Sequence, residues 1–240
     1  MYSTARLAIE SLEPRRLFAG IVLSHHGFLL VAGSVYTANT IVVGLTPDQS
    51  AVTASISFDW RSTPFNITKT FPLTDHLRLV SIRGGLRADS ITIDQTNGAF
   101  PFAARIAGGP GNDTIVGGNQ PDTINGGPGN DSITAGNGHS VLLGGAGNDT
   151  LMAGTGADWM CGGPGRNSVV GGAGNDTLVS WHGGDTLMGG TGPDIFRTIG
   201  LRYSVNNYDS KKDVFQRLVL PSSGGSSFLD GFLNGFLVPF

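Results

Sequence analysis

Apolar and polar positions repeat every nine residues through the middle of the chain. From Gly108 to Arg197 the sequence divides without insertion into ten units of the form Gly-Gly-x-Gly-x-Asp-x-apolar-x. The eighth position is always apolar, and it is filled by Ile115, Ile124, Ile133, Leu142, Leu151, Met160, Val169, Leu178, Leu187 and Phe196. A period this strict indicates one small structural unit stacked many times, and it argues against a disordered linker.

Positions 7 to 9 of each unit predict a short strand, because they are rich in Thr, Val, Ile and Leu. Side chains alternate along a strand, so position 8 faces the interior and positions 7 and 9 face outward. Positions 1 to 6 predict a turn, where glycine supplies positive φ and lets neighbouring backbones approach. Two units form one coil of 18 residues, and ten units predict five coils in a stack roughly 24 Å tall, at about 4.8 Å per strand.

The acidic residues of this region occupy the sixth position and no other. Position 6 is Asp in eight units, and Ser140 and Asn167 are the two exceptions. Winding in 18-residue coils places these residues in two ladders: Asp113, Asp131, Asp149, Asn167 and Asp185 on one edge, and Asp122, Ser140, Asp158, Asp176 and Asp194 on the other. Carboxylates stacked this closely repel one another unless a cation lies between them.

The chemistry of these positions favours one class of metal ion. Carboxylate and backbone carbonyl oxygens are hard ligands, and they suit Ca²⁺ at six or more coordination. Mg²⁺ prefers a tighter octahedron with several waters, so it fits less well. Transition metals would need His or Cys at a fixed position, which the units do not offer.

The units resemble the nonapeptide of the repeats-in-toxin (RTX) family over 90 of the 240 residues. This resemblance implies an all-β, right-handed parallel β-roll, with Ca²⁺ held between successive turns by position-6 carboxylates and by carbonyls of the glycine-rich turn. The carboxylate ligands would be Asp113, Asp122, Asp131, Asp149, Asp158, Asp176, Asp185 and Asp194. The turn ligands would be Gly109, Gly111, Gly127, Gly129, Gly145, Gly147, Gly154, Gly156, Gly172, Gly174, Gly190 and Gly192.

Matching the units to this pattern predicts several calcium ions, about four of them in strong sites. The four intact pairs are Asp113/Asp131, Asp131/Asp149, Asp158/Asp176 and Asp176/Asp194. We expect Asn167 to weaken the sites toward Asp149 and Asp185, and Ser140 to weaken or abolish those toward Asp122 and Asp158. Gln120, Trp181 and His182 also depart from the turn pattern.

Residues 27–107 predict further β-structure that caps or extends the roll, with a separate small β-sandwich as the alternative. GGLRADSIT (residues 84–92) is a degenerate unit with Asp89 at position 6 and Ile91 at position 8, offset from the main array by six residues. AVTASISFDW and HLRLVSI alternate as strands do and suggest a hairpin beside the roll. An open solenoid end exposes an unpaired edge and a bare core, so some cap is needed.

The two ends of the chain carry signals of a different kind. LEPRRLF (residues 12–18) resembles the LEPR-XLL segment of exported bacterial surface proteins, so residues 1–26 are expected to act in targeting. After the array, residues 198–220 predict capping strands, and residues 221–240 a flexible linker and an apolar tail similar to the uncleaved signal of type I secretion. Asp209 and Asp213 could hold a last calcium ion, although a solvated turn is the more common reason for such a pair.

Composition narrows the possible functions. Lys+Arg 15 against Asp+Glu 18 leaves a net charge of −3, which does not fit a nucleic-acid binder. Cys161 is the only cysteine, so no internal disulfide can form and a metal could take that stabilising role. No apolar run is long enough for a transmembrane helix. We also expect the chain to be a monomer.

No group of residues in the sequence has the spacing of a known catalytic site. HExxH is missing, GHSVL (residues 138–142) lacks the second glycine of a nucleophile elbow, and the five histidines show no ligand spacing. We therefore expect a non-enzymatic, calcium-binding protein that is secreted or attached to the bacterial cell surface. The alternatives are a fragment of an RTX enzyme or toxin with its activity in residues 21–107, and an adhesion or matrix module that binds a surface partner or glycan.

Overall fold

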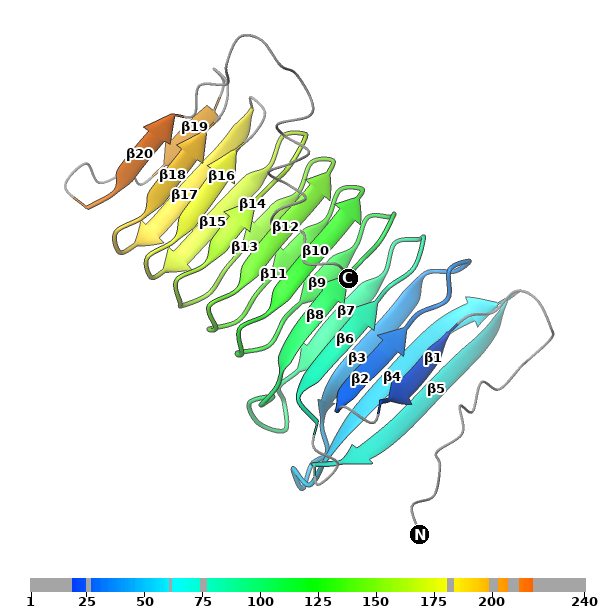
Figure 1. Cartoon of the computed structure of the whole chain (residues 1–240). Coiled ribbons are helices and arrows are strands. Elements are labelled where there is room, and N and C mark those ends of the chain that lie inside the picture. The colour runs from blue at the N-terminus through cyan, green and yellow to red at the C-terminus, as the bar shows by residue number, and fades with distance from the viewer. Residues whose placement is uncertain are drawn as a thin grey trace.

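The computed structural model describes residues 19–24, 27–60, 62–73, 77–180, 184–198, 203–206 and 212–217. In these residues the chain forms twenty β-strands and no α-helix. Figure 1 shows the strands stacked along one axis, from the N-terminal strands in blue at one end to the C-terminal strands in orange at the other. The predicted all-β fold is confirmed.

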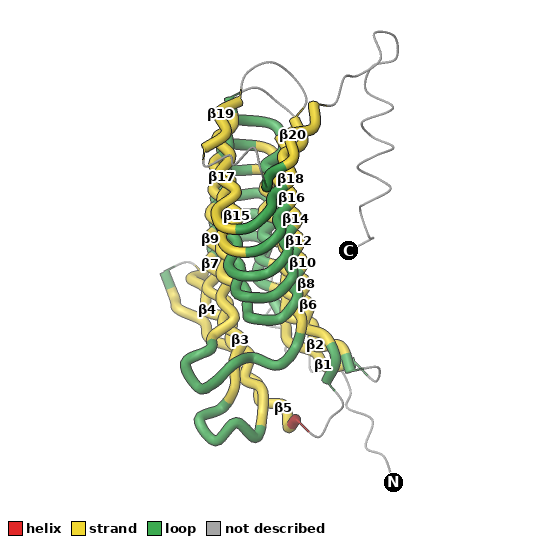
Figure 2. The backbone as a smooth tube through the Cα atoms, turned by 90° about the vertical axis from the view of Figure 1, so that its left-hand side faces the viewer, coloured by secondary structure: helices red, strands yellow, loops and turns green. Residues whose placement is uncertain are grey.

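Two ten-stranded sheets form the two walls of a roll, and loops join them at both edges (Figure 2). Sheet A contains, in spatial order, β1 (Gly20–Leu23), β2 (Phe28–Ala32), β6 (Leu79–Arg83), β8 (Ala103–Ala107), β10 (Thr123–Pro128), β12 (Val141–Ala146), β14 (Trp159–Cys161), β16 (Thr177–Ser180), β18 (Ile195–Thr198) and β20 (Val214–Arg217). Sheet B contains β19 (Tyr203–Asn206), β17 (Asp185–Thr191), β15 (Ser168–Ala173), β13 (Thr150–Met152), β11 (Ser132–Thr134), β9 (Thr114–Val116), β7 (Ser90–Asp94), β3 (Asn39–Leu45), β4 (Ala51–Trp60) and β5 (Thr63–Pro72). Neighbouring strands are parallel except in the pairs β1–β2, β3–β4 and β4–β5.

Within the repeats, paired residues lie 18 positions apart, as the sequence predicts. Ile133 pairs with Ile115 in sheet B, and Leu142 pairs with Ile124 in sheet A. Because the register is constant, the same position of every second unit falls on one line across a sheet. The parallel β-roll with 18-residue coils is therefore confirmed.

The strands before the repeats belong to the same two sheets. β6 pairs with β8, and β7 with β9, in coils of 24 residues, so that Ile91 lies beside Ile115. The six additional residues fall in the loop before β8, where Phe100 turns its ring into the core and is 0% exposed. Farther out, the β4–β5 hairpin continues sheet B antiparallel to β3.

A single line of apolar side chains runs along each inner wall. All ten position-8 residues are at most 1% exposed. The line continues upstream through Val31, Ile82 and Ile106 in sheet A and through Ile41 and Ile91 in sheet B. Burial of each such side chain contributes about 1.5–3 kcal/mol, and no coil can cover its own line without a neighbour.

Candidate metal centres

The position-6 residues of alternate units stack above one another at each edge of the roll. In the first ladder, which precedes the strands of sheet B, the Oδ1 atom of each residue accepts a hydrogen bond from the backbone N–H of the ladder residue one coil earlier. These bonds run from Asn39 to Asp89 (2.6 Å), Asp89 to Asp113 (2.7 Å), Asp113 to Asp131 (2.7 Å), Asp131 to Asp149 (2.8 Å), Asp149 to Asn167 (2.8 Å) and Asn167 to Asp185 (2.8 Å). Asn39 and Asp89 thus lengthen the ladder beyond the repeats.

The second ladder precedes the strands of sheet A and is built in the same way. Its backbone donors and side-chain acceptors are Ala104 to Asp122 (2.7 Å), Asp122 to Ser140 (3.2 Å), Ser140 to Asp158 (2.6 Å), Asp158 to Asp176 (2.9 Å), Asp176 to Asp194 (3.0 Å) and Asp194 to Asp213 (3.0 Å). Asp213 is only 7% exposed, so the solvated turn that its spacing suggested is wrong. It takes the next ladder position because β20 pairs with β18 as a further parallel strand. Asp209 lies outside the described residues.

The second oxygen of the ladder carboxylates, Oδ2, marks the place where a ligand is needed. Seven ladder residues keep a buried Oδ2 atom without a hydrogen-bond partner: Asp89, Asp113, Asp131, Asp149, Asp158, Asp176 and Asp194. Each of them is at most 3% exposed. An ionised oxygen buried without a partner is strongly unfavourable, so these atoms require a cation or a proton.

Backbone carbonyls face the same spaces. A Cβ atom placed on Gly144 would overlap both Oδ2 of Asp149 and the carbonyl oxygen of Gly162 in the next coil. Gly108, Gly126 and Gly171 show the same arrangement in their own turns. A carboxylate and a carbonyl oxygen therefore converge at each of these turns, which is the donor set that Ca²⁺ prefers.

These glycines occupy position 1 of their units, which the sequence reasoning did not select. The carbonyls predicted from the sequence belong to positions 2 and 4, and most glycines at those positions have the expected positive φ, for example +114° at Gly127 and +146° at Gly129. The φ of Gly154 is not positive, which departs from the expected turn. The signal for position 1 was present, since glycine fills it in seven of the ten units.

Two predicted ligands already have protein partners for both oxygens. Oδ2 of Asp122 accepts the backbone N–H of Gly118 at 2.7 Å, in addition to the bond from Ala104. Oδ2 of Asp185 accepts the hydroxyl of Ser180 at 2.6 Å. These two carboxylates, each next to an exception in its ladder, have less need of a cation than the other seven.

Burial governs the electrostatics of both ladders. It raises the pKa of Asp113 to about 7, with the neighbouring carboxylates of Asp89 and Asp131 adding to the rise. Burial also raises the pKa of Asp149 and of Asp176 to about 6. The pKa values of Asp89, Asp122, Asp131, Asp158 and Asp194 are raised for the same main reason.

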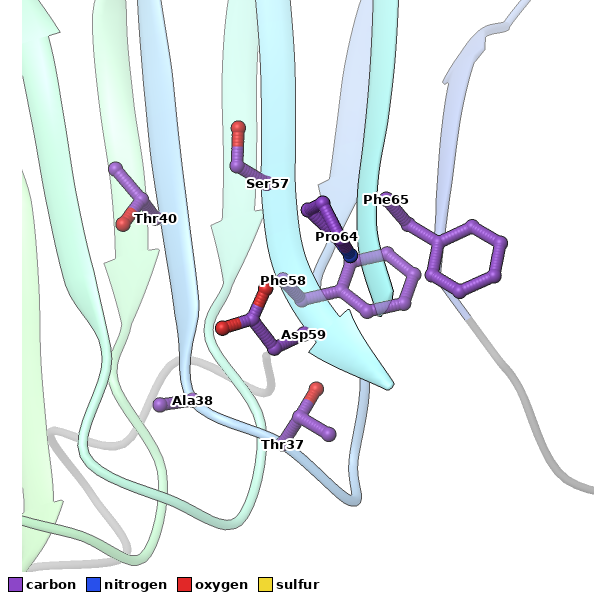
Figure 3. Close-up of a pocket in the computed structure, with 8 residues that line it drawn as sticks. All are labelled: Thr37, Ala38, Thr40, Ser57, Phe58, Asp59, Pro64 and Phe65. Carbon is purple, nitrogen blue, oxygen red and sulfur yellow. The ribbon is translucent and has the colours of Figure 1, made fainter. Parts of the chain in front are cut away.

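The described part of the chain offers little support for other kinds of site. Among the described residues, no three His, Cys, Asp or Glu side chains gather to form a metal cluster, so each ladder site consists of carboxylates supplemented by carbonyls. A cavity of about 280 Å³ lies between β3, β4 and β5. Figure 3 shows Asp59, Phe58 and Phe65 in its wall. The rings of Phe58 and Phe65 are stacked, with their centroids 5.6 Å apart. Among the described residues of that lining, Asp59 is the one ionisable group.

The fold and its ladders define a repeat protein with stacked carboxylates at both edges of a parallel β-roll. Residues 107–142, 126–160, 134–169, 143–178 and 162–196 match the family model described as RTX calcium-binding nonapeptide repeat (4 copies). The chain is therefore a calcium-binding repeat protein over this region. No curated protein matches the sequence. Within the described residues, no helix has the length and apolar character needed to cross a membrane.

Proposed function

We propose that the chain is a non-enzymatic protein of the cell exterior or cell surface whose folding is coupled to calcium binding. The observation that supports this is the set of seven buried carboxylate oxygens without a hydrogen-bond partner. At neutral pH their charges oppose stacking of the coils, and a divalent cation between the turns removes that opposition. The chain would stay loosely folded at cytosolic calcium levels and close at the millimolar levels found outside cells.

The repeats give four sites in which both members of a pair keep a partnerless oxygen. These are Asp113/Asp131, Asp131/Asp149, Asp158/Asp176 and Asp176/Asp194. The resemblance of residues 12–18 to an export-related segment supports the proposed location, although these residues lie outside the described part of the chain.

Circular dichroism tests the coupling of folding to calcium. The β-spectrum should be strong in millimolar Ca²⁺, weaken on addition of a chelator and return when Ca²⁺ is restored. Mg²⁺ at the same concentration should restore it poorly, because Mg²⁺ requires a tighter octahedral shell. A β-spectrum that does not change on chelation would contradict the proposal, and calorimetry should find at least four ions per chain.

An adhesive role is the second candidate, and the outer face of sheet B favours it. Position 7 of its strands carries hydroxyls in a continuous row: Thr40, Ser90, Thr114, Ser132, Thr150, Ser168 and Thr186. Beside this row, Val116, Met152 and Met188 are 38–47% exposed. A flat uncharged face of this kind suits a glycan or protein surface. Binding to immobilised cell-surface glycans that is lost in Met152→Lys would support the adhesive role. Trp159→Ala tests in the same way whether the outer face of sheet A binds glycans.

A further inference from the structure

We propose that the first ladder holds a calcium ion between Asp113 and Asp89, the second of which lies outside the residues that match the repeat family, and that Asn39 ends the column of ions. The inference rests on the calcium-dependent fold proposed above and adds a site to it. The family match begins at residue 107, and Asp89 belongs to a degenerate turn with Arg87 at the position where the repeats usually carry glycine.

Asp89 has the same environment as the ladder residues within the repeats. It is 3% exposed, and its Oδ2 atom is buried without a hydrogen-bond partner, as is Oδ2 of Asp113. The backbone N–H of Asp89 donates to Oδ1 of Asp113 over 2.7 Å, so the two carboxylates belong to adjacent coils at the same edge. The coil between them is 24 residues long, but its additional residues lie in the loop before β8, away from this edge.

A carbonyl completes the resemblance to the other sites. A Cβ atom on Gly84 would lie 2.5 Å from Oδ2 of Asp89 and 2.5 Å from the carbonyl oxygen of Gly108. Two oxygens therefore face one space that only a glycine hydrogen leaves open. Two carboxylates and a carbonyl are hard oxygen donors, and together with water they can meet the coordination of Ca²⁺.

One coil farther out, an amide nitrogen occupies the corresponding place. Nδ2 of Asn39 lies 2.8 Å from Oδ1 of Asp89 and within hydrogen-bond distance of three carbonyl oxygens, those of Ser34 (2.9 Å), Thr37 (2.9 Å) and Gly84 (3.2 Å). Four oxygens thus surround a nitrogen that carries partial positive charge. The amide nitrogen of Asn39 therefore neutralises its oxygen cluster without a metal, as a cation would do one coil later between Asp89 and Asp113. No ion is needed between Asn39 and Asp89.

Native mass spectrometry of the whole chain at saturating Ca²⁺ counts the bound ions and tests the site. Asp89→Asn should bind one ion fewer than the wild type, whereas Asp94→Asn, a matched change in β7 outside both ladders, should leave the count unchanged. Asn39→Asp should bind one ion more, because it replaces the amide nitrogen with an anionic oxygen. Equal counts for the wild type and Asp89→Asn, or no gain in Asn39→Asp, would overturn the inference.

Two further results separate this inference from the proposed function. A wild-type chain that binds no Ca²⁺ would overturn the proposed function itself. If Asp89→Asn does not fold, anomalous diffraction from wild-type crystals grown in Ca²⁺ decides the matter. It should show a peak between Asp89 and Asp113 and none between Asn39 and Asp89, and a missing first peak would overturn the site.

Discussion

The side-chain amide of Asn167 donates a hydrogen bond to the carbonyl oxygen of Gly163 in its own turn, over 3.0 Å. The same side chain accepts the N–H of Asp149 at Oδ1, as the aspartates of the first ladder do for their neighbours. Asn167 therefore keeps the hydrogen bond that stacks the ladder. Its amide nitrogen also donates to a carbonyl oxygen, which an aspartate side chain cannot do without a bound proton. Asn167 holds a coil in place without a charge.

Replacing this residue by aspartate should strengthen the dependence on calcium. In Asn167→Asp the bond to Gly163 is lost and a carboxylate faces a carbonyl, so the melting temperature in chelator should fall. In saturating Ca²⁺ the variant should bind at least one more ion, because the ladder from Asp149 to Asp185 becomes continuous. Thermal melts and calorimetry with and without Ca²⁺ measure both effects. Asn66→Asp, at an exposed position of β5, adds the same charge elsewhere. It should change neither the melting temperature in chelator nor the number of bound ions.

The metal-free chain should become more folded on acidification. The pKa of Asp113 is about 7 in the folded chain against an ordinary 3.8. The folded chain thus holds a proton in the range where the unfolded chain has released it, so its free energy of unfolding falls as the pH rises from about 4 to about 7. Asp149 and Asp176 act in the same direction up to about pH 6.

Circular dichroism in chelator measures this dependence, and the β-signal should be larger at pH 5 than at pH 7.5. The apparent affinity for Ca²⁺ should move the opposite way and rise with pH, since protons compete for the same oxygens. Asp113→Asn should flatten the dependence near pH 7. A metal-free β-signal that grows from pH 5 to pH 7.5 would show that these carboxyls are not protonated in the fold.

A turn glycine should tolerate no side chain. Gly129 has φ +146°, and a Cβ atom there would overlap the carbonyl of Gly111 in the coil below. Gly129→Ala should cost about 1–3 kcal/mol from backbone strain alone, and more from the overlap, as measured by urea unfolding in Ca²⁺. Pro128→Ala, one residue earlier, should change little, because Ala146 stands at the equivalent position of the next unit in sheet A.

The core residues should respond as tightly packed side chains do. Leu142 is 0% exposed, and Leu142→Ala should lower the free energy of unfolding in Ca²⁺ by about 2–5 kcal/mol through the cavity that it leaves. Its outward-facing neighbour Val141 is only half-buried, so Val141→Ala should cost less than about 1 kcal/mol. Equal losses for the two variants would mean that the inner and outer walls are not distinguished as described.

Much of the site could be predicted from sequence because its physics is periodic. Position 8 is apolar in every unit and position 6 is Asp in all but two, so Leu142 and Asp131 could be placed in the core and in a ladder from their spacing alone. The ladder position of Asp213 could not be predicted, because its 19-residue step from Asp194 departs from the strict period of 18. Neither the role of Asn39 nor that of Ser180 was predicted, since hydrogen bonds from an amide or a hydroxyl depend on where loops of irregular length bring them.

The constant 18-residue register has a mechanical consequence. Each coil shares its strand hydrogen bonds, its ladder bond and its core line only with the coils on either side. Under tension from the C-terminal side, the outermost coil is therefore the first to lose support, and the coil beneath then becomes outermost. Within the repeats the molecule should lengthen in equal steps of about 60 Å, the span of 18 extended residues, with bound calcium setting the force required for each step.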